Sequence, residues 1–226
     1  IARSYKNTAS GPQDVSENEV FSLLKGGLRT LTVLMSPDLL LEEYFLLRQV
    51  LLRASSLGRA VLAYRGRSLT SVEEILVSPD YASNFRGAQL AGLVGESPEG
   101  DYQEVLAKIR RKEIENILLL GDRSVDPKDI DAELLEGIRA AKVSVGILTD
   151  LDSPLTAVVS HVVAGRSILE KSGLLVNRAL RLQYTQAVVP LKDTTCPEWR
   201  YIALLAESSG NKIVPGDVRG MSDRDL

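Results

Sequence analysis

Apolar residues in the first two thirds of the chain follow two recurring patterns. Short runs rich in β-formers, at 31–35, 60–64, 114–120 and 143–149, alternate with longer segments whose apolar residues recur every three to four positions. The first pattern predicts buried strands and the second predicts amphipathic helices. Their alternation is typical of a parallel sheet, because parallel strands need helical crossovers between them.

The longer segments predict helices beginning near residue 16 and over 38–56, 102–112 and 130–141. Ser36-Pro37-Asp38 predicts the start of the second helix, with proline at the first helical position. The section 65–100 carries scattered prolines and glycines and predicts a long irregular segment. Beyond residue 150 we expect a short strand at 161–164, extended pieces at 174–176 and 180–184, and a last helix over 197–209.

These elements predict an α/β protein with a mostly parallel, doubly wound sheet and helices on both faces, plus a smaller C-terminal region of short strands and a helix. Residues 1–15 are polar and predict a linker or tail. Residues 16–150 form the expected sheet domain, 151–210 the C-terminal part of the same domain, and 211–226 a tail. The chain begins at Ile1 without a signal-like segment, so we interpret it as a piece of a longer polypeptide.

Composition removes several classes of function. The 27 basic and 30 acidic residues among 226 create no field that would attract nucleic acid. No apolar run approaches the roughly 20 residues that span a bilayer, so we expect no direct membrane insertion. Cys196 is the only cysteine, and it cannot form an intrachain disulfide or supply the about four thiolates of an iron-sulfur cluster. We interpret Cys196 as an ordinary loop thiol.

Ligands of open α/β sheets bind beyond the carboxyl ends of the strands. The turns expected there carry Arg65, Arg67 and Arg123, which together would hold an anion such as phosphate. Solvated loop arginines are the alternative, and a binding module for anionic ligands remains open on this basis. None of these turns contains a dinucleotide fingerprint or a phosphate-binding loop.

The remaining polar candidates have structural explanations. His161 is the only histidine and lies in an apolar segment, so we expect a structural role for it. The pairs Glu42-Glu43 and Glu73-Glu74 are interpreted as helix or loop surface. The basic run 108–112 closes a helix, where cations complement the helix dipole. The residues alone therefore identify no catalytic, cofactor-binding or metal-binding side chain.

Residues 170–183 carry the most informative motif of the chain. Glu170, Gly173, Asn177, Arg181 and Gln183 match the pattern E-x-x-G-T-x-x-N-x-x-G-R-x-Q. This run resembles the molybdopterin oxidoreductase superfamily and the related large iron-sulfur subunit of NADH:quinone oxidoreductase, respiratory complex I. Leu174 and Leu180 stand where that pattern has its threonine and its second glycine.

Other segments match the same families in the same order along residues 16–210. Residues 36–38 with 41–44 resemble a strand followed by a helix with an acidic pair. Residues 84–88 are similar to an N-x-R-G-A element of the complex I branch. Residues 117–124 resemble a strand that ends in a G-x-N-P turn, but Arg123 and Ser124 replace the last two residues. Residues 156–165 resemble T-A-x-x-A-D-V-V-L-P, with Ser160, His161 and Gly165 at altered positions, and 197–206 resemble the closing helix.

The resemblance implies a cofactor-free structural domain of the large subunit, which supports electron transfer from NADH to quinone in the peripheral arm. It implies other peripheral-arm subunits as partners and a cytoplasmic location beside the inner membrane of a bacterium. Iron-sulfur clusters are expected in the parent subunit and none in this segment. The alternative is a fragment of a pterin-binding molybdenum or tungsten oxidoreductase, such as a formate dehydrogenase, with molybdopterin as its cofactor.

Overall fold

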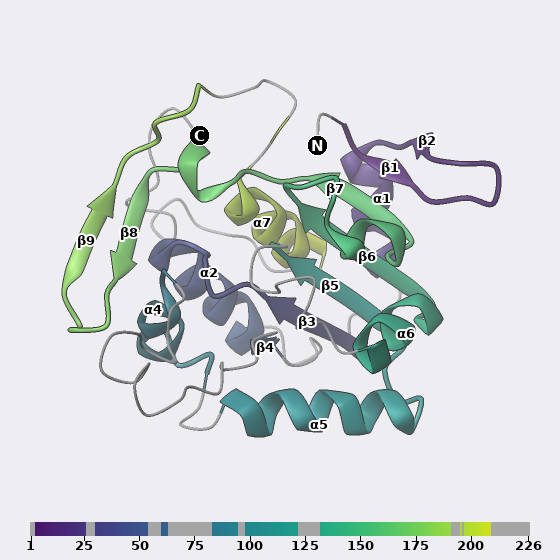
Figure 1. Ribbon diagram of the computed structural model, residues 1–226, viewed down its shortest axis with the longest axis horizontal. Coiled ribbons are helices and arrows are strands. Elements are labelled where there is room, and N and C mark those ends of the chain that lie inside the picture. Colours follow the sequence, from purple (N-terminus) through teal and green to yellow (C-terminus); the bar gives the residue numbers. More distant parts are fainter. Residues whose placement is uncertain are drawn as a thin grey trace.

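A seven-stranded sheet forms the centre of the fold (Figure 1). The computed structural model describes residues 3–25, 30–53, 60–62, 83–94, 98–121, 132–190, 195 and 197–208. Its parallel strands are β3 (Leu31–Met35), β4 (Ala60–Leu62), β5 (Asn116–Leu120), β6 (Val143–Leu148) and β7 (His161–Ala164). They lie in the order β4-β3-β5-β6-β7, a common doubly wound order. The predicted α/β class is confirmed.

Helices cover both faces of this sheet. One face packs against α1 (Glu17–Lys25), α2 (Leu41–Arg53) and α7 (Glu198–Ser208). The other packs against α5 (Pro98–Arg110) and α6 (Ala132–Ala140), which run beside each other in Figure 1. Among the described residues, no helix has the length and apolar content needed to cross a bilayer.

Strand β5 shows why four successive residues, 117–120, are apolar. Leu118 and Leu120 point into the core beneath α2 and α7, whereas Ile117 and Leu119 point into the core beneath α5 and α6. Successive side chains of a strand alternate between faces, so a strand covered on both faces needs a continuous apolar run. At the described positions, the strand bounds agree with the sequence prediction to within two residues.

The C-terminal region adds a second, antiparallel sheet of two strands, β8 (Gly173–Val176) and β9 (Leu182–Thr185). Strand β8 contacts α2 and the short helix α4 (Phe85–Leu90). The hairpin lies at the left edge of Figure 1, beyond α2 and α4. The 3₁₀ turn Pro154–Ala157 connects β6 to β7 within the main sheet, and the 3₁₀ turn Ile168–Glu170 leads from β7 to β8.

The N-terminal segment is part of the sheet. Residues 1–15 were expected to form a tail, but β1 (Tyr5–Lys6) and β2 (Gln13–Asp14) form a hairpin, and β1 pairs antiparallel with β7. Tyr5 is buried in the core beside α5 and α6. A two-residue strand is too short for the alternation of apolar and polar residues to reveal it, so no strand was predicted here.

The structure also corrects two boundaries. Helix α2 begins at Leu41, three residues after the expected start. Ser36 Oγ accepts the N–H of Asp38 as a cap would, but residues 37–38 form a turn in which Asp38 accepts the N–H and hydroxyl of Ser83. Glu43 caps α2, accepting the N–H of Leu40 at 2.9 Å. The section 65–100 is not irregular throughout, since it contains α4 and the start of α5.

Candidate functional site

The candidate site lies at the carboxyl ends of β3 and β5, where the strand order reverses and open α/β sheets bind ligands. The two turns that follow these strands are in direct contact. The N–H of Ser36 donates to Leu120 O at 2.8 Å, and the N–H of Gly121 donates to Ile147 O at 3.0 Å. Polar groups at this edge are therefore already paired with neighbouring strand ends.

Gly121 brings the turn after β5 against the turn after β3. Its φ of +83° is in the left-handed region that favours glycine, and a Cβ at this position would lie 2.8 Å from Ser36 Cβ. The expected G-x-N-P-like turn thus begins with a glycine that its geometry requires. Its continuation through Arg123 and Ser124 lies outside the described residues.

The space left between the described residues of this edge is small. The cavity has a volume of about 20 Å³, which is enough for one water molecule, whereas small-molecule pockets measure roughly 300–1,000 Å³. It is lined by Ser36, Asp38, Leu39, Gly121, Thr149, Arg166, Ser167, Ile168, Lys171 and Glu198. In the described part of this edge, side chains and turns thus fill most of the space beside the ends of β3 and β5.

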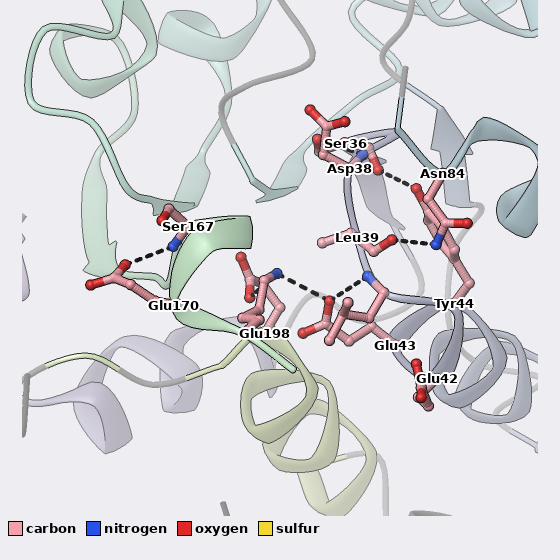
Figure 2. A network of polar contacts seen from close by, with 12 residues as sticks. Ser36, Asp38, Leu39, Glu42, Glu43, Tyr44, Asn84, Ser167, Glu170 and Glu198 are labelled. Carbon is pink, nitrogen blue, oxygen red and sulfur yellow. Dashed lines mark hydrogen bonds and ion pairs between the residues drawn. The ribbon is translucent and has the colours of Figure 1, made fainter. Parts of the chain in front are cut away.

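A buried cluster of three charged side chains lies beside that cavity. Lys171 Nζ lies 2.8 Å from Glu198 Oε2 and 3.2 Å from Glu43 Oε2, and all three side chains are at most 4% exposed. Figure 2 shows Glu43 and Glu198 facing each other at the starts of their helices. The cluster joins α2, α7 and the segment before β8, which are far apart in the sequence.

The cluster is not electrically balanced, since it contains one cation and two carboxyl groups. Burial raises the pKa of Glu198 to about 7, although the nearby Lys171 opposes this change. Burial alone would lower the pKa of Lys171, but Glu198 and Glu43 outweigh burial and raise it. Lys171 therefore remains cationic at ordinary pH, and the proton on Glu198 titrates near neutrality.

Glu43 corrects the interpretation of Glu42-Glu43 as surface residues. Glu43 is fully buried, and its Oε1 has no hydrogen-bond partner within the described structure. Glu42 is half-buried and accepts the N–H of Leu174 with both carboxylate oxygens, at 3.1 and 3.0 Å. Burial raises the pKa of Glu42, and the Leu174 amide partly offsets that effect.

Asn84 is the second polar group that supports β8. Its amide donates to Leu39 O at 2.7 Å (Figure 2). It also accepts the N–H of Val176 at 2.7 Å. A Cβ at Gly87 would collide with the Asn84 amide, so the glycine leaves room for this side chain. The Asn-x-x-Gly spacing of residues 84–87 thus connects α4, the start of α2 and β8.

The 170–183 motif also has identifiable structural roles. Glu170 accepts the N–H of Ser167 at 2.9 Å, and a Cβ at Gly173 would lie 2.8 Å from a methyl carbon of Leu40. Asn177 Oδ1 accepts the N–H groups of Ala179 and Arg181, both at 3.0 Å. Arg181 and Gln183 are exposed. The first three motif residues shape the backbone that carries the last two.

Leu180 occupies the position at which the related pattern has its second glycine. Its φ is +59°, in the left-handed region, and its side chain is 69% exposed. The hairpin turn therefore keeps the backbone conformation that suits glycine, although the residue has changed. Such a conformation costs a non-glycine residue about 1–2 kcal/mol.

Ser160 and His161 stand at altered positions of the 156–165 motif and have structural contacts. Ser160 accepts the N–H of Ser144 at 3.0 Å and donates its hydroxyl to Ser144 O at 2.7 Å, which fixes the start of β7 against β6. His161 Nδ1 lies 3.0 Å from Ser160 Oγ. Burial and the positive charge of Lys6 lower the pKa of His161. These contacts agree with a structural role for this histidine.

Several sequence candidates fall outside the described residues. They are Arg65, Arg67, Arg123, Cys196, Glu73 and Glu74. Of the basic run 108–112, Lys108 pairs with Glu104, Arg110 with Glu133 and Arg111 with Glu113. In the part of the chain that the structure describes, no group of three histidine, cysteine, aspartate or glutamate side chains is placed to hold a metal ion.

A larger groove of about 640 Å³ lies between α5 and α6. It is lined by Ile109, Arg110, Lys112, Ile114, Glu115, Glu133, Glu136, Gly137, Ala140 and Lys142. Residues 114–115 and 142 precede β5 and β6, so the groove lies at the amino ends of these strands, away from the ligand-binding edge. Its charges are mixed, and Arg110 is already paired with Glu133.

Lys171 and Glu198 were missed as site residues, because neither stands out from its neighbours in sequence. Glu43 did give a signal, since it falls on the apolar face of α2 among Leu39, Leu40, Leu46 and Leu47. A carboxylate in an apolar stripe indicates a buried partner. No protein-family model matches this chain, and no curated protein matches it at a significant level.

We expect Lys171→Met to lower the free energy of unfolding by about 3–5 kcal/mol, because it leaves two buried carboxyl groups without their cation. Lys108→Met is the matched control, since it removes a half-exposed lysine whose partner is Glu104 and should cost less than about 1 kcal/mol. Urea unfolding of both variants measures the difference. Similar losses in the two would contradict a central role for the buried cluster.

Glu198 should make stability depend on pH. Its folded pKa, about 7, lies above the ordinary value of 4.5, so its contribution is fully present below pH 4.5 and is lost as pH rises through 7. We expect Glu198→Gln to flatten the fall in stability between pH 5 and 8 by roughly 1–3 kcal/mol relative to the unchanged chain. Glu113→Gln, at an exposed site, should leave the profile unchanged, and parallel profiles for all three proteins would refute the assignment.

We expect Leu180→Gly to raise the free energy of unfolding by about 0.5–1 kcal/mol, because relief of the left-handed strain outweighs the extra freedom of glycine in the unfolded chain. Leu180→Ala separates the two causes, since it removes the exposed side chain and keeps the strain. Denaturant melts of both variants give the comparison. A gain with alanine equal to that with glycine would assign the effect to the side chain.

Proposed function

We propose that this chain is a cofactor-free structural domain of the large iron-sulfur subunit of an NADH:quinone oxidoreductase. The observation that carries the proposal is the filled carboxyl edge of the sheet. Among the described residues, a buried ion cluster and two touching turns lie at that edge and leave a cavity of about 20 Å³. A domain that holds a pterin dinucleotide would need a pocket more than ten times larger there.

The roles of the motif residues support the same proposal. Asn84, Gly87, Gly173 and Asn177 make close contacts within the chain, so their pattern persists for packing alone. A family motif kept for its shape, with Leu174 and Leu180 replacing two of its residues, fits a domain that has lost its ligand and retained its fold. In this proposal the domain carries no catalytic residue.

The role of such a domain is to support neighbouring parts of the enzyme. The parent subunit would bind iron-sulfur clusters through cysteines outside this segment and pass electrons from NADH toward quinone. Other peripheral-arm subunits would be its partners, on the cytoplasmic side of a bacterial inner membrane. The apolar edge of the C-terminal hairpin is available for such contacts.

The test is the cofactor content of the full-length parent protein, purified from its native source. We expect iron at cluster stoichiometry, with no molybdenum, tungsten or extractable pterin. A molybdenum enzyme taken through the same purification is the control for loss of pterin. Stoichiometric pterin with molybdenum or tungsten would overturn the proposal in favour of a pterin-binding oxidoreductase such as a formate dehydrogenase.

A further inference from the structure

Strand β9 is the outer strand of the C-terminal hairpin, and its side chains are unusually exposed for their type. Leu182 is 57% exposed and Tyr184 is 66% exposed. They pair with Val176 and Leu174 of β8, so all four side chains lie on one face of the hairpin. Val176 is buried, and the apolar face therefore continues outward from the core onto β9.

The main-chain hydrogen bonds of β8 indicate which groups of β9 face outward. The N–H groups of Leu174 and Val176 bond to Glu42 and Asn84, away from β9, and the N–H of Asn177 donates to Arg181 O. In an antiparallel pair the bonded positions alternate, so the main-chain groups of Leu182 and Tyr184 point away from β8. Within the described residues, β9 has β8 as its sole partner strand.

Natural proteins usually protect an exposed strand edge with lysine, proline or a bulge. Residues 182–185, Leu-Gln-Tyr-Thr, contain no charge and no proline. Edges of this kind accept an extended segment through main-chain hydrogen bonds, and side-chain pockets provide the specificity. The β9 edge has the geometry of such an acceptor.

Charge indicates the chemistry of the occupant. Residues 172–190 contain Arg178 and Arg181, both exposed, and no acidic residue, although the whole chain has a net charge of −3. A second copy would bring two more arginines to the same edge, which like-charge repulsion opposes. Arg181 and Gln183 lie on the face opposite Leu182 and Tyr184, so a complementary strand would alternate apolar and acidic side chains.

We propose that β9 is a docking edge for an extended segment of a partner polypeptide in which apolar and acidic residues alternate, and that this segment adds to the hairpin as a third strand. The inference rests on the proposed function, because it identifies the surface by which a structural domain would hold a neighbouring subunit. Leu182 and Tyr184 contact the apolar residues of the segment, and Arg178 and Arg181 contact its carboxylates.

Amide hydrogen exchange of the whole 226-residue chain tests this arrangement residue by residue. The probe is a short synthetic peptide that alternates glutamate and valine. At about ten times its Kd, we expect exchange at the amides of Leu182 and Tyr184 to slow roughly tenfold by mass action. The amides of Gln183 and Thr185, which face β8, should change little and serve as internal controls.

Two matched changes, one in the peptide and one in the protein, distinguish charge-selective addition of a strand from nonspecific strand pairing. A peptide that alternates lysine and valine should give no protection to the unchanged chain, and Arg178→Glu with Arg181→Glu should reverse the preference between the two peptides. Equal protection by both peptides, no protection by either, or protection caused by self-association at the same edge would overturn the proposal. Cofactor content of the parent protein does not depend on these variants, so each proposal fails by its own measurement.

Discussion

A buried lysine that pairs with two buried glutamates determines how the C-terminal half of this protein meets its sheet. Transfer of such charges out of water costs several kcal/mol each, and mutual pairing is what makes their burial tolerable. Lys171 can reach Glu43 and Glu198 only if α2, α7 and the segment before β8 converge at one point. The charges thus contribute to specifying the arrangement, whereas the apolar core supplies most of its stability.

The convergence of these segments also affects how much space the carboxyl edge of the sheet leaves for a ligand. In related architectures the strand ends diverge and leave a crevice for a ligand. Among the described residues, Gly121 places one turn against Ser36, and Lys171 and Glu198 of the ion cluster line the small cavity beside it. In the proposed function, this edge contributes packing and ion pairing in place of a ligand site.

The sequence predicted the sheet well because buried strands and amphipathic helices have strong local periodicities. Strands 31–35 and 161–164 have the expected bounds.

The predictions that were wrong have physical causes. Lys171 pairs with residues 128 and 27 positions away, so no local pattern reports it. The start of α2 was placed too early because the Ser36-Pro37-Asp38 signal forms a separate turn, in which Asp38 bonds to Ser83. Glu43 was called surface although its position in an apolar stripe argued against that interpretation.

The support of β8 by two side chains distinguishes this strand from the strands of the main sheet. Among the described strands, none pairs with its inner edge, where Glu42 and Asn84 accept its N–H groups instead. A backbone ladder cannot be removed by a point substitution, because every residue except proline carries the same amide. Hydrogen bonds that side chains make to a strand can instead be weakened or lost by substitution of one residue at a time. The attachment of the hairpin to the sheet domain is therefore open to gradual evolutionary adjustment without alteration of the sheet itself.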